Sequence, residues 1–160
     1  MREEPPEVTE DEDESFSPAS GFALVSGDLN IFKLIYECRF LRREHLSALT
    51  QRPAKRLHRR LFKLVQNGYL TTIRLPQQKH IYGLGKAALP LLVEQGMADP
   101  EILAQRLRIH ELKELFLKHE MMIVDIHVML ALASSTGDLR LCAWREGREL
   151  YDSVPVADHD

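Results

Sequence analysis

The chain has 160 residues, of which 44% are hydrophobic and 28% are charged. These values are ordinary for a globular protein with a hydrophobic core, and they exclude a chain that is disordered throughout. The formal net charge of −3 on its own indicates no polyanionic partner. The charges are segregated, however: residues 1–14 carry eight acids and one base, whereas residues 39–86 carry twelve bases and one acid, Glu44. This basic stretch is the most informative feature of the sequence.

The sequence favours a cytoplasmic protein with no membrane partner. Its N-terminus is acidic and lacks the apolar run of a signal peptide. The most apolar stretch, residues 121–133, is interrupted by Asp125 and His127 and is too short to span a bilayer. Cys38 and Cys142 are far apart in sequence, so we expect two reduced thiols rather than a disulfide framework or a cysteine-rich zinc site.

The chain is predicted to begin with a disordered acidic tail over residues 1–27, which are rich in acids and proline and poor in apolar side chains. The apolar spacing after Asp28, a candidate N-cap, predicts a helix that ends near Cys38. A short extended link over residues 39–41 then leads to a short helix over residues 43–49, which ends in a tight turn.

The strongest helical pattern runs from Pro53 to Asn67. Pro53 suits the first turn of a helix, where its missing N–H needs no partner, and Gly68 suits the position after the last turn. The apolar residues of this helix form one core-facing stripe, which consists of Ala54, Leu57, Leu61, Leu64 and Val65. Two β-rich segments, residues 69–75 and 80–84, then predict a hairpin around a polar break.

After the hairpin, Gly85 opens a predicted helix over residues 86–95. Further helices are expected over residues 101–109 and 110–133, with short strands over residues 139–144 and 153–157. The 110–133 helix is apolar nearly all round, which is typical of a helix in a core or an oligomer interface. We therefore expect a homodimer through this helix, by analogy with winged-helix proteins that dimerise outside their motif.

The expected fold class is α+β, mostly α. It comprises a winged helix-turn-helix over residues 28–96 and a C-terminal extension of helix and short strands over residues 97–160. In a winged helix the third helix enters the DNA major groove, and the hairpin lies along the backbone or the minor groove. The outer face of the 53–67 helix carries bases with no acid close enough in sequence to pair with them.

We predict that this surface binds double-stranded DNA, because phosphates would neutralise charges that otherwise repel one another along the helix. The predicted DNA-binding residues are Arg42, Arg43, Arg52, Lys55, Arg56, Arg59, Arg60, Lys63, Arg74, Gln77, Gln78, Lys79 and His80. The simplest alternative is a solvated charged face, although such a face normally mixes signs. Two others are a winged-helix module whose basic face binds an acidic protein and a fragment of a nuclease-associated protein.

A family resemblance rests on four segments. Residues 59–70, RRLFKLVQNGYL, followed by residues 81–85, IYGLG, are similar to a pattern of many prokaryotic winged-helix proteins. With HEMMIVDI at residues 119–126 and WREGREL at residues 144–150, the layout most resembles the replication-relaxation (plasmid replication/relaxation) family. The resemblance implies prokaryotic DNA binding linked to the replication and mobilisation of plasmids or mobile elements. A transcription regulator is the other role that we consider.

Other chemistry receives little support from the sequence. There is no phosphate-binding glycine loop, nucleophile elbow or reactive-cysteine context, so we expect no enzymatic activity, no cofactor and no small-molecule ligand. His110, His119 and His127 are too widely spaced along one helix to share a metal ion, and we expect none. The acidic tail either only solvates the chain or folds back over the basic surface and competes with DNA.

Overall fold

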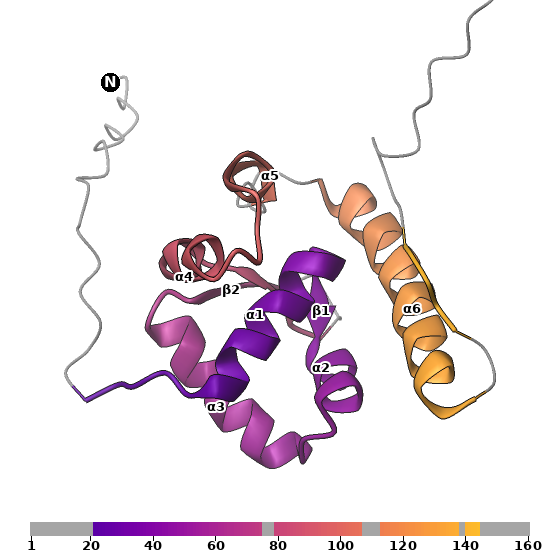
Figure 1. Ribbon diagram of the computed structural model, residues 1–160, viewed down its shortest axis with the longest axis horizontal. Coiled ribbons are helices and arrows are strands. Elements are labelled where there is room, and N and C mark those ends of the chain that lie inside the picture. Colours follow the sequence, from indigo (N-terminus) through magenta and orange to yellow (C-terminus); the bar gives the residue numbers. More distant parts are fainter. Residues whose placement is uncertain (1–20, 75–78, 107–112, 138–139, 145–160) are drawn as a thin grey trace, which may run out of the picture.

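The computed structural model describes residues 21–74, 79–106, 113–137 and 140–144. In chain order the elements are α1 (Ser26–Cys38), β1 (Leu41–Arg42), α2 (Arg43–Thr50), α3 (Ala54–Gln66), β2 (Leu70–Ile73), β3 (Ile81–Leu84), the 3-10 helix η1 (Lys86–Ala88), α4 (Leu89–Glu94), α5 (Pro100–Arg106) and α6 (Glu114–Thr136). Helices predominate and are combined with a small antiparallel sheet (Figure 1), which confirms the predicted class, α+β and mostly α.

The core lies between α1, α2, α3 and the sheet, whose strand order is β1-β3-β2. Leu41 of β1 pairs with Tyr82 of β3, and Leu70 of β2 pairs with Leu84 on the other side. Every residue of the central strand β3 is buried. The largest fully buried side chains are Ile31, Phe32, Ile35, Phe40, Leu41, Leu46, Leu57, Leu61, Leu64, Ile81, Leu92 and Leu103. Burying each of these contributes about 1.5–3 kcal/mol before the entropy of ordering is subtracted.

α3 forms where its apolar spacing predicts it. Its buried residues are Leu57, Leu61 and Leu64, whereas Ala54 of the predicted stripe is exposed in the first turn. At the other end the Asn67 side chain donates to the Lys63 carbonyl at 2.8 Å, and Gly68 has a φ of 69°. A glycine at this position ends the helix without the penalty of a Cβ, as the sequence predicted.

Gly85 fixes the end of the hairpin against the end of α3. A Cβ at this position would lie 2.1 Å from the carbonyl oxygen of Gly68, so no larger residue fits without a backbone shift. The contact is reinforced by two backbone hydrogen bonds, from Gly85 N–H to the Tyr69 carbonyl at 2.9 Å and from Ala87 N–H to the Gly68 carbonyl at 3.1 Å.

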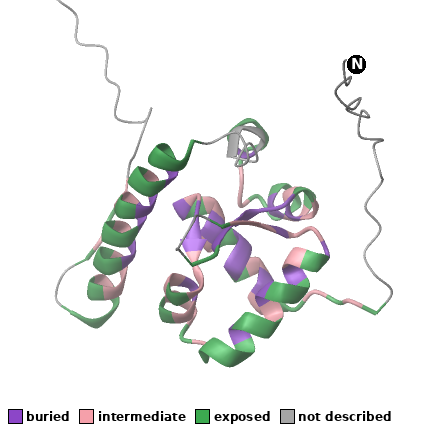
Figure 2. Cartoon of the chain, turned by 180° about the vertical axis from the view of Figure 1, so that it is seen from behind, coloured by how far each residue is buried: buried purple, intermediate pink, exposed green. Residues whose placement is uncertain are grey.

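α6 packs along the side of the core formed by α2 and β1 (Figure 1). Its inward side buries Leu117, Met121, Val124 and Val128, and Figure 2 shows exposed residues along the opposite side. None of the helices within the described ranges is long and apolar enough to cross a membrane.

The chain after α6 returns beside it. Leu141 N–H donates to the Ser134 hydroxyl at 2.8 Å, and the Trp144 ring stacks on His127 with centroids 4.4 Å apart. The strand predicted over residues 139–144 does not form in its described part, since residues 140–144 are neither strand nor helix. Its predicted partner at residues 153–157 is outside the described residues.

The structure corrects several element boundaries. α1 begins at Ser26, so Asp28 lies in its first turn instead of at the N-cap, and its carboxylate accepts from Val25 N–H at 2.8 Å. The link predicted over residues 39–41 contains the start of strand β1. The helix predicted over residues 86–95 divides into η1 and α4.

α6 begins at Glu114, after an extended Lys113, and not at residue 110. α5 begins at Pro100, where the Asp99 carboxylate accepts from Glu101 N–H at 2.8 Å. Residues 107–112, between these two helices, are outside the described residues.

Candidate nucleic-acid interface

The outer side of α3 presents four exposed bases, which we call the basic face: Lys55, Arg56, Arg59 and Lys63. The buried leucines hold the opposite side of the helix on the core and leave these side chains in solvent. α3 contains no acid, and none of the four bases forms an ion pair with another described residue. In an ordinary solvated charged surface, bases are paired with nearby acids. The basic face has no such acids among the described residues.

Arg60 does not belong to the basic face, contrary to the sequence prediction. Its Nε donates to Asp28 Oδ1 at 2.9 Å, and its Nη2 donates to Asp28 Oδ2 and, at 2.8 Å, to the Ala23 carbonyl. The guanidinium also lies over the Phe22 ring, 4.7 Å from the centroid. The hydrogen bond with Asp28 raises the pKa of Arg60 above its ordinary value, against the opposing effect of burial. Arg60 is thus part of the packing between α1 and α3.

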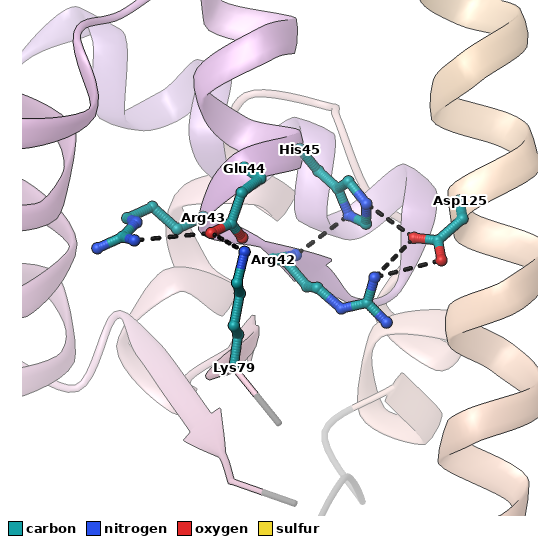
Figure 3. Close-up of polar contacts among 6 residues, drawn as sticks. All are labelled: Arg42, Arg43, Glu44, His45, Lys79 and Asp125. Atoms are coloured by element: carbon teal, nitrogen blue, oxygen red, sulfur yellow. Dashed lines mark hydrogen bonds and ion pairs between the residues drawn. The ribbon is translucent and has the colours of Figure 1, made fainter. Parts of the chain in front are cut away.

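A small pocket beside α3 lies between the start of α2 and the hairpin. It is lined by Arg43, Glu44, His58, Lys79, His80 and Tyr82. Glu44 lies between two bases in Figure 3, with Lys79 Nζ at 3.0 Å and Arg43 Nη2 at 3.6 Å. Partial burial acts to raise the pKa of Glu44, but the hydrogen bonds that the carboxylate accepts and the nearby charges of Lys79 and Arg43 together outweigh it and leave that pKa lowered. The carboxylate therefore stays ionised and holds the hairpin against α2.

Arg42 also departs from its predicted role, because it points at α6. Its Nη1 donates to both carboxylate oxygens of Asp125, at 2.9 and 3.2 Å (Figure 3). His45 reaches the same carboxylate, with Nε2 2.8 Å from Asp125 Oδ1, while its Nδ1 accepts from Arg42 N–H at 3.2 Å. Burial lowers the pKa of His45 despite the nearby Asp125. The neutral ring thus donates from Nε2 and helps to fix α6 on α2.

The other predicted residues divide into three groups. Arg52 is half-buried, and a Cβ at Gly27 would lie only 1.5 Å from its guanidinium, so Arg52 packs against the start of α1. Arg74, Lys79 and His80 are exposed at the open end of the hairpin. The remaining two, Gln77 and Gln78, lie outside the described residues.

Three residues of this surface were not predicted as site residues. Phe62 is 58% exposed, and it lies three residues after Arg59 and four before Gln66, in the middle of the outer side of α3. Helical spacing alone could have found it, as it could have found His58 on the same helix. Glu44 was noted only as the lone acid of the basic stretch, and nothing local indicates that Lys79 would reach it.

The described part of the chain contains no group of three His, Cys, Asp or Glu side chains close enough to hold a metal ion. The chemistry available at this surface is charge, hydrogen bonding from guanidinium and amide groups, and contact with an exposed aromatic ring. These are the groups that contact phosphates and base edges in nucleic acids.

The family model described as replication-relaxation matches residues 32–153, a span that runs from within α1 past the end of α6. Comparisons with curated proteins and with solved structures found no significant match. The family match indicates a role related to replication.

Proposed function

The chain belongs to the replication-relaxation family, as its sequence motifs predicted, and from this membership we propose that it is a double-stranded DNA-binding protein of winged-helix type. Its role in the cell is that of an accessory in the replication or mobilisation of a plasmid or similar element. A transcription regulator would use the same surface.

The arrangement of α2, α3 and the hairpin supports this proposal. A tight turn at Gln51, where φ is 54°, separates α2 from α3, and the β2–β3 hairpin follows α3 directly. In a winged helix the helix in the place of α3 enters the major groove, and the hairpin follows the backbone beside it. The basic face and the exposed bases of the hairpin would then both meet phosphates.

The observation that carries the proposal is the basic face itself. Like charges at spacings of three and four residues repel one another along a helix, so the isolated surface is electrostatically unfavourable. A DNA backbone supplies the missing counter-charges, and its own condensed cations are released on binding. Glu44 has the opposite effect, since its carboxylate repels phosphate and occupies Lys79.

The test is the salt dependence of binding to a labelled random duplex, followed by fluorescence anisotropy. We expect affinity to fall steeply with salt, and Arg59→Ala to reduce the slope of log K against log salt by about 1. Lys33→Ala is the matched control, because Lys33 is an exposed base on α1 that pairs with Glu37. Glu44→Gln removes a carboxylate that repels phosphate, so this variant should bind the duplex more tightly than wild type at low salt.

The proposal fails if the wild-type chain shows no duplex binding at low salt. It also fails if Arg59→Ala and Lys33→Ala reduce the slope equally, because the basic face would then contribute nothing specific.

A further inference from the structure

α6 has a second apolar side that the protein's own core does not cover. The inward residues belong to the hydrophobic core on the side of α2, whereas large apolar side chains on the other side are exposed to solvent. The exposed fractions are 81% for Leu115, 65% for Met122, 61% for Met129, 50% for Ile126, 40% for Phe116 and 39% for Leu130. A helix that is apolar on two opposite sides is typical of one that packs between two bodies.

The outward residues repeat every seven positions. Leu115, Met122 and Met129 occupy the d positions of successive heptads. The a positions that alternate with them along the helix are His119, Ile126 and Ala133. The seam extends over about 27 Å of helix at 1.5 Å per residue. A row with this spacing fits into the corresponding row of a second helix that has the same period, by knobs-into-holes packing.

The charges on α6 permit two identical copies of this side to meet. Asp125 is exposed, but Arg42 and His45 hold its carboxylate toward the core. Lys118 and Glu114, near the N-terminal end, pair with each other at 2.6 Å. From His119 to Thr136 the outward row itself therefore carries no carboxylate or ammonium, so a copy of itself meets no opposing like charge.

The size of the exposed surface also suits self-association. The six exposed side chains present on the order of 600 Å² of apolar surface, at the upper end of what a monomer shows. One partner of a standard interface contributes about 800 Å². The seam with its flanking residues is thus nearly sufficient for a stable pair.

We propose that a second copy of this chain packs its α6 against this side, so that the protein is a two-fold symmetric dimer. A two-fold interface uses the same patch on both subunits, which a uniformly apolar heptad seam satisfies. The dimer does not depend on the proposed DNA binding. If both hold, the two basic faces are related by the two-fold axis, and the preferred target is an inverted repeat.

The test is sedimentation equilibrium of the full chain at micromolar concentration, with reductant present because Cys142 is an exposed thiol. We expect a dimer for the wild type and a monomer for Met122→Lys, with helical circular dichroism retained. Ile102→Lys is the matched control, since Ile102 is an exposed apolar residue of α5, outside the seam, and this variant should stay dimeric. Met129→Lys repeats the test if Met122→Lys does not fold.

A monomeric wild type would overturn the proposal. If, in that monomer, Met122→Lys also lowers the melting temperature while Ile102→Lys does not, the seam is covered by residues of the same chain. Dimers that persist in both Met122→Lys and Met129→Lys would equally exclude α6 as the interface. None of these outcomes depends on DNA, so the dimer and the DNA-binding proposal can fail separately.

Discussion

Asp28 is completely buried, and Arg60 provides the positive charge that makes its burial tolerable. A buried carboxylate without such a partner carries a large desolvation penalty. Arg60 supplies two hydrogen bonds to the carboxylate and one to the Ala23 carbonyl, and Val25 N–H supplies another to the carboxylate. The pair thereby closes the start of α1 onto the middle of α3.

Two neighbouring arginines of α3, Arg59 and Arg60, should differ greatly in how much stability the protein loses when each is replaced by alanine. Arg60→Ala leaves the Asp28 carboxylate buried without a positive partner, with only the hydrogen bond from Val25 N–H, and we expect the free energy of unfolding to fall by roughly 3 kcal/mol. Arg59→Ala removes only an exposed side chain and should change stability by less than about 0.5 kcal/mol. Urea unfolding at neutral pH measures both values. Equal effects on stability would contradict the distinct roles assigned to the two residues.

The difference between Arg59 and Arg60 was only partly accessible from sequence. Arg60 lies three residues after Leu57 and four before Leu64, so helical spacing sets it beside the buried stripe. Its partner, however, is 32 residues away in the chain. Local periodicity contains no information about that pairing, and both arginines were therefore assigned to DNA.

Among the elements, α2 and α6 are joined through one shared carboxylate. Asp125 of α6 accepts from Arg42 and from His45, and Arg39 contacts Glu120, nearer the N-terminus of the helix, at 3.3 Å. These polar contacts flank the apolar inward side of α6. They specify where on the core the helix lies, since apolar packing alone is less directional.

The contact between His45 and Asp125 predicts that the stability of the protein depends on pH. Burial lowers the pKa of His45 in the folded state below its ordinary value of 6.5, so the unfolded chain takes up a proton first as the pH falls. The free energy contributed by the neutral ring is therefore fully present above pH 6.5 and is lost as the pH decreases below it. Chemical unfolding at a series of pH values between 5 and 8 should show a shallower slope for His45→Gln than for wild type. Identical slopes would be inconsistent with this role of His45.

The element prediction succeeded where the signal is local. The hairpin follows from two β-rich runs around a polar break, and α3 follows from its leucine spacing and from Gly68. β1 is only two residues long, and its pairing of Leu41 with Tyr82 joins distant parts of the chain. Similarly, nothing near Arg42 in sequence indicates that Asp125 would be its partner. The orientation of the basic residues was therefore less predictable than the elements that carry them.

At the scale of the whole molecule, the net charge of −3 conceals an acidic N-terminus and a basic face. Residues 1–14 contribute eight of the 24 acids of the chain. Such a segment lowers the average potential that an approaching polyanion experiences, and salt screens this effect over about 10 Å at 0.1 M.

Removal of residues 1–14 should therefore strengthen DNA binding at low salt. The truncation removes seven net negative charges and leaves the remaining chain net positive. We expect a higher association constant for random duplex at 50 mM salt, and a difference that diminishes as the salt concentration is raised. A full-length variant with the eight acids replaced by Gln or Asn is the control for chain length. Unchanged affinity in both variants would show that the segment only solvates the protein.

The contact of Gly85 with Gly68 has a mechanical consequence. No side chain lies between these two glycines. The backbone that follows the hairpin is therefore hydrogen-bonded directly to the backbone that follows α3. A rotation of α3 must therefore carry the base of the hairpin with it, and a force applied at the hairpin reaches the helix without passing through flexible side chains. The two parts of the proposed DNA interface, α3 and the hairpin, are thus expected to move together as one rigid body.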